Sequence, residues 1–206
     1  MNSYFTVENE TNAEYEVKRS RFIGYIKPVK TKDEAESFVA SVRQKHHDAR
    51  HNVFAYKVRE DNFKRYSDDS EPQGTAGVPV LDVIEKNELT DVCIVVTRYF
   101  GGILLGGGGL VRAYSHTASL AVEAGIKIEM STCISFTLEC DYSFFGKVGS
   151  ILEENGGIIE NTDYLDSVIV SGYIPEGKFS LINSKIIEAS AGAYKLTEKD
   201  KLFAKI

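Results

Sequence analysis

The stretch from Val92 to Gly125 constrains the fold most, because its hydrophobic pattern changes across a run of glycines. Residues 92–97 are apolar and mostly β-branched, which is typical of a strand covered on both faces. After the glycines, apolar side chains recur every three or four residues, as on one face of a helix. The sequence therefore predicts a strand, a glycine loop and a helix, with Arg98 before the loop and Arg112 in the first helical turn.

Two interpretations of the glycine loop are open. The first turn of a helix carries unpaired N–H groups and the positive end of the helix dipole, and two arginines beside it would attract phosphate. Alternatively, the glycines only let the helix pack tightly on the strand. No lysine follows any of the loop glycines, as a P-loop would require, and no Gly-x-Gly-x-x-Gly fingerprint is complete there. The candidate anion- or nucleic-acid-binding residues here are Arg98, Tyr99, Gly101, Gly102, Gly106, Gly108, Gly109 and Arg112.

Charge and cysteine content limit the class of protein. The net charge of −6 over 206 residues excludes a chain that is basic throughout, so any nucleic-acid contact must come from a local patch. Three cysteines without metal-ligand spacing favour a reducing cytoplasm. We see no apolar signal segment and no apolar run of membrane-spanning length, so we expect a cytoplasmic protein with no membrane contact.

The first half of the chain alternates strand and helix signals. Thr31 and Glu34 form a capping-box pattern at the start of a helix. Pro79 suits the first turn of another helix, which we expect to run through Leu89. The expected strands are Glu14 to Lys18 and Phe22 to Val29 around a turn at residues 19–21, and then His51 to Val58.

A basic run lies at residues 43–65, where seven Lys and Arg residues accompany three Asp and Glu residues. Such a run is either a solvated helix end with a hairpin or a patch for a phosphate backbone. Arg50, His51 and Lys57 are its candidate binding residues. No zinc site is predicted, because His47 and His51 lack further ligands.

An acidic, turn-rich loop follows the basic run. Its carboxylates could bind a hard cation, face the basic run or cap the next helix. We predict no dedicated metal or cofactor site here. The residues of this acidic loop are Ser67, Asp68, Asp69, Glu71 and Gly74.

Beyond Gly125 the pattern restarts as a second domain. The order strand, helix, strand, strand, helix, strand is that of a ferredoxin-like split unit. We expect an α+β protein with a domain at 1–132 and another at 133–206. The expected elements are strands at 134–140, 158–165, 167–174 and 194–197 and helices at 144–152 and 179–189.

Several motifs together resemble the Impact family, in its bacterial YigZ/YvyE-like branch. The most specific are Ser67-Asp68-Asp69 with Glu71-Pro72 and Gly74-Thr75-Ala76-Gly77, and Val96 to Gly102 followed by Leu105-Gly106 and Gly108 to Ser115. Arg21 to Gly24, Lys45-His46, Asp48-Ala49, His51-Asn52 and Ala55-Tyr56 add to the match. The sequence departs from the usual family residues at Ser70, Gly107, Val53 and His116, where Gly, Ala, Cys and Gly are common.

The resemblance implies an N-terminal domain like domain 2 of ribosomal protein S5 and a C-terminal domain like domain V of elongation factor G. Eukaryotic relatives restrain a translation-initiation kinase by competing for its activator protein. For bacterial members, contact with nucleic acid or the ribosome is an inference from the fold alone.

Three functions follow as hypotheses. The first is a non-enzymatic binding protein in translation or RNA metabolism, whose partner is RNA or the ribosome, with Tyr99 or Phe100 stacking on a base. The second is a metal-assisted enzyme using Asp68, Asp69 and Glu71. The third is a regulator that binds protein without RNA. If the acidic loop instead pairs with the two arginines, the glycine stretch is a structural clasp and the binding surface lies on the basic run.

Overall fold

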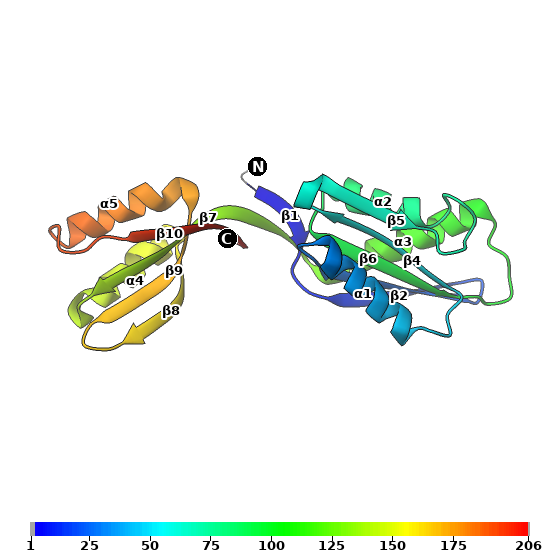
Figure 1. Cartoon of the computed structure of the whole chain (residues 1–206), viewed down its shortest axis with the longest axis horizontal. Helices are drawn as coiled ribbons and strands as arrows, with labels where there is room; N and C mark the ends of the chain where they lie inside the picture. Colours follow the sequence, from blue (N-terminus) through cyan, green and yellow to red (C-terminus); the bar gives the residue numbers. More distant parts are fainter. Residues whose placement is uncertain (1–2, 206) are drawn as a thin grey trace. The chain divides into compact units, whose positions relative to one another are not determined.

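The computed structural model describes residues 3–205 (Figure 1). The chain forms two compact units, one of Tyr4–Ile128 and one made mainly of the residues from Glu129 onward. Strand β7 (Lys127–Cys140) begins in the first unit and continues in the second. The described helices include none long and apolar enough to cross a membrane.

A five-stranded antiparallel sheet forms the centre of the N-terminal unit. Its central strand is β6, in which every residue from Val92 to Arg98 is buried. The apolar strand expected at 92–97 is confirmed, but it extends through Arg98 and Tyr99, which pair with neighbouring strands instead of following the end of β6. The strand order is β2 (Thr11–Val17), β3 (Ser20–Pro28), β6 (Val92–Tyr99), β4 (His51–Val58) and β5 (Phe63–Ser67).

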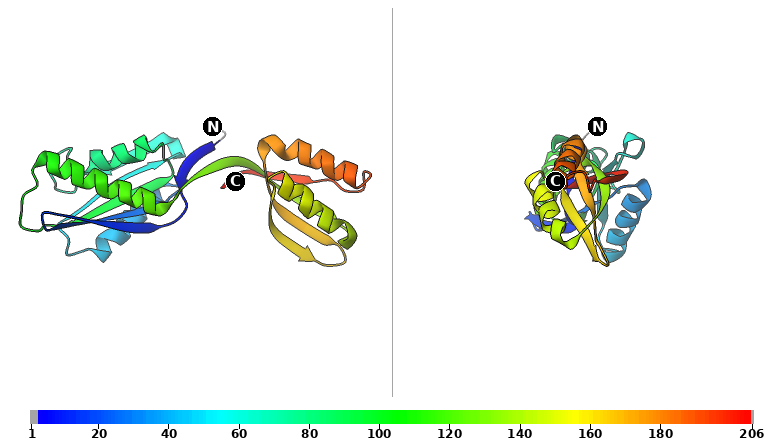
Figure 2. Two further views of the ribbon diagram at one scale, coloured as in Figure 1. Left: turned by 180° about the vertical axis from the view of Figure 1, so that it is seen from behind. Right: turned by 90° about the vertical axis from the view of Figure 1, so that its left-hand side faces the viewer.

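Helices cover both faces of this sheet (Figures 1 and 2). Helix α1 (Lys32–Lys45) packs on the face that holds Cys93 and Val95. Helices α2 (Gly77–Lys86) and α3 (Gly107–Gly125) pack on the face that holds Ile94 and Val96. The alternation of side chains along one apolar strand thus supplies two separate cores.

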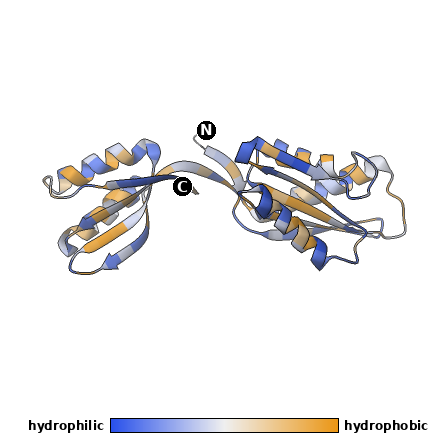
Figure 3. Ribbon diagram, viewed as in Figure 1, coloured by the Kyte–Doolittle hydropathy of each residue, from blue (hydrophilic) through white to orange (hydrophobic). Residues whose placement is uncertain are grey.

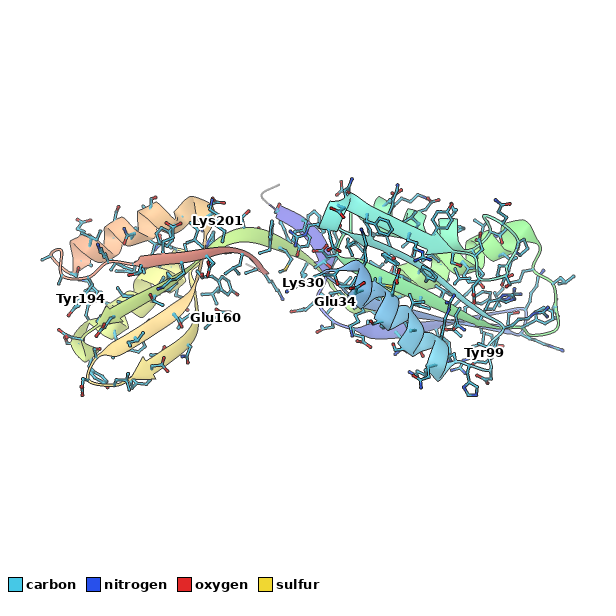
Figure 4. All side chains as sticks on the ribbon, viewed as in Figure 1. Lys30, Glu34, Tyr99, Glu160, Tyr194 and Lys201 are labelled. Atoms are coloured by element: carbon cyan, nitrogen blue, oxygen red, sulfur yellow. The ribbon has the colours of Figure 1, made fainter. Side chains whose placement is uncertain are left out.

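Local signals located most of these elements, with shifted ends. Thr31 caps α1 by accepting a hydrogen bond from the Glu34 amide at 3.2 Å, as the capping box predicts. Figure 4 labels Lys30 and Glu34 at this helix start. The hairpin turn lies at Lys18 and Arg19, both with positive φ, and not at residues 19–21. Helix α2 ends at Lys86, short of Leu89. Four elements were not predicted from the sequence: β1 (Ser3–Val7), β5 and the short 3-10 turns Glu60–Asn62 and Glu176–Lys178.

The C-terminal unit has the predicted β-α-β-β-α-β order. Strand β7 pairs with both β9 and β10, and β8 pairs with β9, all antiparallel. Strand β1 is also assigned to this sheet, next to β7. The elements after β7 are α4 (Tyr142–Glu154), β8 (Ile158–Tyr164), β9 (Val168–Pro175), α5 (Phe179–Ala189) and β10 (Thr197–Lys205).

The last strand was predicted wrongly at 194–197. Strand β10 begins only at Thr197, and its first residues are charged and exposed, so Figure 3 shows it as largely hydrophilic. Tyr194 and Leu196 nevertheless contribute to the core of this unit. These two residues are hydrophobic because they pack into the core, although their segment is not a strand. An edge strand can form from charged residues, because backbone hydrogen bonds hold it to its neighbour.

Candidate anion-binding site

The glycine loop occupies residues 100–106 between β6 and α3. Gly101 lies against the β2–β3 turn, because a Cβ there would come within 2.0 Å of the Arg19 carbonyl carbon. Gly106 has φ 71° and open space around it, so glycine is needed there for backbone conformation. The loop is therefore fixed at one end by packing and at the other by a left-handed turn.

Helix α3 begins at Gly107, earlier than its apolar periodicity indicates. Its N-cap residue, Gly106, has no side chain to cap the helix, and the Leu110 amide makes the first intrahelical bond to the Gly106 carbonyl at 2.9 Å. Arg112 consequently lies in the second turn and not in the first, so the expected placement of that side chain at the helix start is wrong.

A cleft of about 390 Å³ opens at this helix start. Its polar side is formed by Arg50, His51, Glu71 and Arg98, and it includes the backbone of Gly106 and Gly107. Arg112 does not line this cleft but a separate depression beside Tyr15, His116 and Ser119. The structure therefore does not bring Arg98 and Arg112 to one anion. The apolar wall of the cleft consists of Pro72, Phe100, Leu104, Leu105 and Leu110.

Arg98 is buried, with 5% of its surface exposed, and its guanidinium pairs with the Glu71 carboxylate at 2.5 Å. The Tyr114 hydroxyl donates a second bond to the same carboxylate oxygen at 2.8 Å. Burial, and then the nearby Glu71 charge, raise the pKa of Tyr114, which stays protonated. His51 Nε2 lies 3.8 Å from the same oxygen. Within residues 3–205, the Arg98 Nε has no hydrogen-bond partner.

The acidic loop is engaged in other contacts. The Asp68 carboxylate accepts bonds from the amides of Gly74, Ala76 and Gly77, so it caps α2. Asp69 accepts from Arg43 at 2.9 Å and from the Asn52 amide at 2.6 Å.

The Ser67 hydroxyl accepts a bond from the Asp69 amide at 3.2 Å. Among the described residues, no group of three His, Cys, Asp or Glu side chains is arranged to hold a metal ion. Of the three roles considered for this loop, capping and pairing with basic residues are the ones its contacts display.

The basic run 43–65 is not one continuous positive surface. Four of its seven cations pair with carboxylates, and a fifth, Lys45, lies 4.8 Å from the centre of the Tyr25 ring. Arg50 is exposed on the cleft, and Lys57 is half-buried on β4. The paired cations are Arg43 with Asp69, Arg59 with Asp91, Lys64 with Glu85 and Arg65 with Glu36.

Tyr99 is tied into a polar network instead of facing a ligand. Its hydroxyl donates to Asp48 at 2.9 Å and lies 2.9 Å from His46 Nδ1. Figure 4 shows Tyr99 near the end of α1, far along that helix from Lys30 and Glu34. The neighbouring Phe100 is 44% exposed and is the ring of the two that remains available for stacking.

Two further cations lie beside the glycine loop. They were not among the binding residues predicted from the sequence. Lys18 and Arg19 form the exposed β2–β3 turn beside Gly101, and Lys18 lines a small depression together with Arg112. Within residues 3–205, neither they nor Arg50 and Arg112 form an ion pair. We call Lys18, Arg19, Arg50 and Arg112 the cationic rim. The two consecutive basic residues Lys18 and Arg19 at the predicted hairpin turn could have indicated this cluster from the sequence.

Comparison with known proteins identifies the chain. The family model of the Impact N-terminal domain matches residues 18–122, which include β3, the acidic loop and most of α3. The IMPACT family member YvyE of Bacillus subtilis is 36% identical over 199 residues, which is 96% of this chain and 92% of YvyE. The chain belongs to the Impact family. YigZ of Escherichia coli, another member, is 34% identical over 88% of this chain and 90% of its own.

Other comparisons match part or nearly all of this Impact family protein. A domain of unknown function, DUF1949, matches residues 138–193. Protein IMPACT of the rat matches only 43% of this chain, at 33% identity, and 29% of its own length. A solved structure titled as the crystal structure of an hypothetical protein covers 97% of this chain at 32% identity and a TM-score of 0.62.

Proposed function

We propose that this Impact family protein is a non-enzymatic, cytoplasmic RNA-binding protein that acts in translation or RNA metabolism. The observation that carries the proposal is the cationic rim, whose four exposed cations surround the glycine loop without carboxylate partners in the described part of the chain. Unpaired cations gathered at one place in an acidic protein provide the local patch that binding to a phosphate backbone requires.

Exposed apolar side chains on the same loop support contact with bases. Phe100, Ile103 and Leu104 are 44%, 42% and 81% exposed. An aromatic ring beside cations is the usual arrangement for binding single-stranded nucleic acid, in which bases stack and phosphates pair with arginine.

The metal-assisted alternative has less support. Asp68 is committed to three amides, Asp69 to Arg43 and a backbone amide, and Glu71 to Arg98 and Tyr114. A carboxylate that serves as a cap or a buried ion-pair partner would have to exchange those bonds for metal coordination.

The test is RNA affinity measured as a function of salt. A single-stranded RNA of mixed sequence should bind at low salt, and Lys18→Gln with Arg112→Gln should lower the slope of log affinity against log salt by about 1 to 2 units. Lys86→Gln is the control, because it removes one exposed cation at the far end of α2 from the acidic loop. No binding at low salt contradicts the proposal.

A second candidate is protein docking, favoured by the 81% exposure of Leu104. Leu104→Ser should then abolish co-purification of a defined protein partner while RNA remains unbound at every salt concentration. If ribosomes co-purify with the protein and free RNA displaces them, the first function is favoured instead.

A further inference from the structure

The start of α3 is uncapped. First-turn amides have no acceptor within their own helix, and a side chain usually provides one. Thr31 caps α1 and Asp68 caps α2, whereas the N-cap of α3 is Gly106, which has no side chain. Gly106 and Gly107 line the cleft at the start of this 19-residue helix, where the dipole favours an anion.

Arg98 supplies an independent sign of a missing acceptor. The side chain lines the cleft, it is about nineteen-twentieths buried, and its Nε has no partner among the described residues. A buried donor without an acceptor is destabilising, and more so when it is charged. Glu71 accepts from Nη1 alone, so the guanidinium has further donors for the oxygen of a ligand in the cleft.

The charge of the cleft fits a dianion. Arg50 and Arg98 contribute two positive charges and Glu71 removes one, while the helix start adds roughly half a charge. A phosphate monoester carries about −1.5 to −2 charges at neutral pH, whereas an internal phosphodiester carries one. The attraction therefore increases for a phosphate at the end of a chain.

The remaining wall fits an organic group attached to that phosphate. Phe100, Leu104 and Leu110 are among the apolar side chains opposite the polar groups. The volume of the cleft, about 390 Å³, lies within the range of small-ligand sites, which combine apolar walls with a few placed polar groups. A bare inorganic ion would leave the apolar wall uncovered.

We infer that this cleft seats the terminal phosphate monoester of an RNA chain, with the last nucleoside against Phe100 and Leu104. The inference rests on the proposed RNA binding and specifies which part of the RNA is recognised. The phosphate oxygens receive the first-turn amides of α3 and pair with Arg50 and Arg98, while the cationic rim holds the following backbone.

The experiment compares one RNA sequence with a 5′-phosphate, a 3′-phosphate or neither, using fluorescence anisotropy on the full chain. We expect one phosphorylated form to bind about tenfold more tightly than the unphosphorylated RNA. Gly107→Asp should remove this preference, because a carboxylate at the helix start repels phosphate while it favours the helix itself. Gly146→Asp is the matched control and should keep the preference, since it adds the same carboxylate at an exposed glycine of α4, where a Cβ meets nothing within 4 Å.

Two further variants separate the site from general binding. Arg50→Gln should reduce the end preference, and Lys86→Gln should leave it unchanged. Equal affinity of the wild type for all three RNAs overturns this inference but leaves the proposed function standing, whereas no binding of any RNA at low salt overturns both. Adenosine monophosphate binding as tightly as the phosphorylated RNA also overturns it, because the ligand would then be a free nucleotide. Thermal melting confirms that each variant is folded.

Discussion

Arg98 and Glu71 form a buried ion pair that joins the strand before the glycine loop to the acidic loop, 27 residues away in sequence. Both side chains have at most 6% exposure, so each charge depends on the other for its compensation. The pair forms only the Arg98 half of the clasp considered from the sequence, because Arg112 takes no part in it. It does so while leaving the Arg98 Nε without a partner in the described part of the chain, so a structural role and a ligand role are compatible.

Breaking this pair should destabilise the protein strongly. Removal of one partner of a buried ion pair costs about 3–5 kcal/mol, because the other charge remains buried without compensation. Arg98→Met should therefore lower the free energy of unfolding in urea by that amount. The double variant Arg98→Met with Glu71→Leu should recover part of the loss, since no charge is left buried. A double variant that is no more stable than Arg98→Met contradicts this account.

The positions of most strands and helices followed from local patterns, whereas the partners of charged residues did not. The alternation in β6 and the capping box at Thr31 involve neighbours in sequence, so they are visible in the sequence. For Arg98 the sequence left two roles open, a phosphate ligand or a partner of the acidic loop, because Glu71 comes from another segment. Sequence spacing alone cannot show which carboxylate a strand arginine meets.

The C-terminal end of the fold shows the same limit. Tyr194 and Leu196 carry a hydrophobic signal that favoured a strand, but that signal comes from core packing. Strand β10 forms from a charged segment through backbone pairing with β7, which has no local hydrophobic signature. The cations Lys18 and Arg19 were missed for a related reason, because their proximity to Gly101 depends on the register of β2, β3 and β6.

Loss of the Asp68 carboxylate should destabilise the start of α2. Three amides donate to it, and removal of a helix cap typically costs about 0.5–2 kcal/mol. We expect Asp68→Ala to lie at the upper end of this range in urea unfolding, with Asp68→Asn intermediate. Asp82→Ala is the matched control, because it removes an exposed carboxylate from the same helix. Equal effects of Asp68→Ala and Asp82→Ala would show that the cap contributes little.

His46 should make the stability of the N-terminal unit depend on pH. The Tyr99 hydroxyl donates to Asp48, so His46 Nδ1 can only donate to it, and in a neutral ring Nε2 then accepts from the Tyr25 hydroxyl at 2.7 Å. Burial, and then the charge of Lys45, lower the pKa of His46 below its ordinary value. The unfolded chain therefore binds the proton more readily. The contribution is present above the unfolded pKa of about 6.5 and is lost as pH falls through the folded value.

The measurement is the free energy of unfolding at pH 7.5 and at pH 5.5. Wild type should lose more stability on acidification than His46→Gln, which has no proton to gain at this position. His47→Gln is the control, because His47 is exposed and should leave the wild-type pH dependence in place. The same pH dependence in wild type and His46→Gln removes His46 as the cause.

Two glycines of the central stretch should respond in opposite directions to alanine. A Cβ at Gly101 would lie 2.0 Å from the Arg19 carbonyl carbon, so Gly101→Ala must displace the β2–β3 turn from the loop. A Cβ at Gly108 meets nothing within 4 Å, so Gly108→Ala should stabilise α3 by up to about 1 kcal/mol. Thermal unfolding of both variants decides the matter: a lower midpoint for Gly101→Ala and an equal or higher one for Gly108→Ala are expected. A large loss of stability in Gly108→Ala would contradict the open space around Gly108.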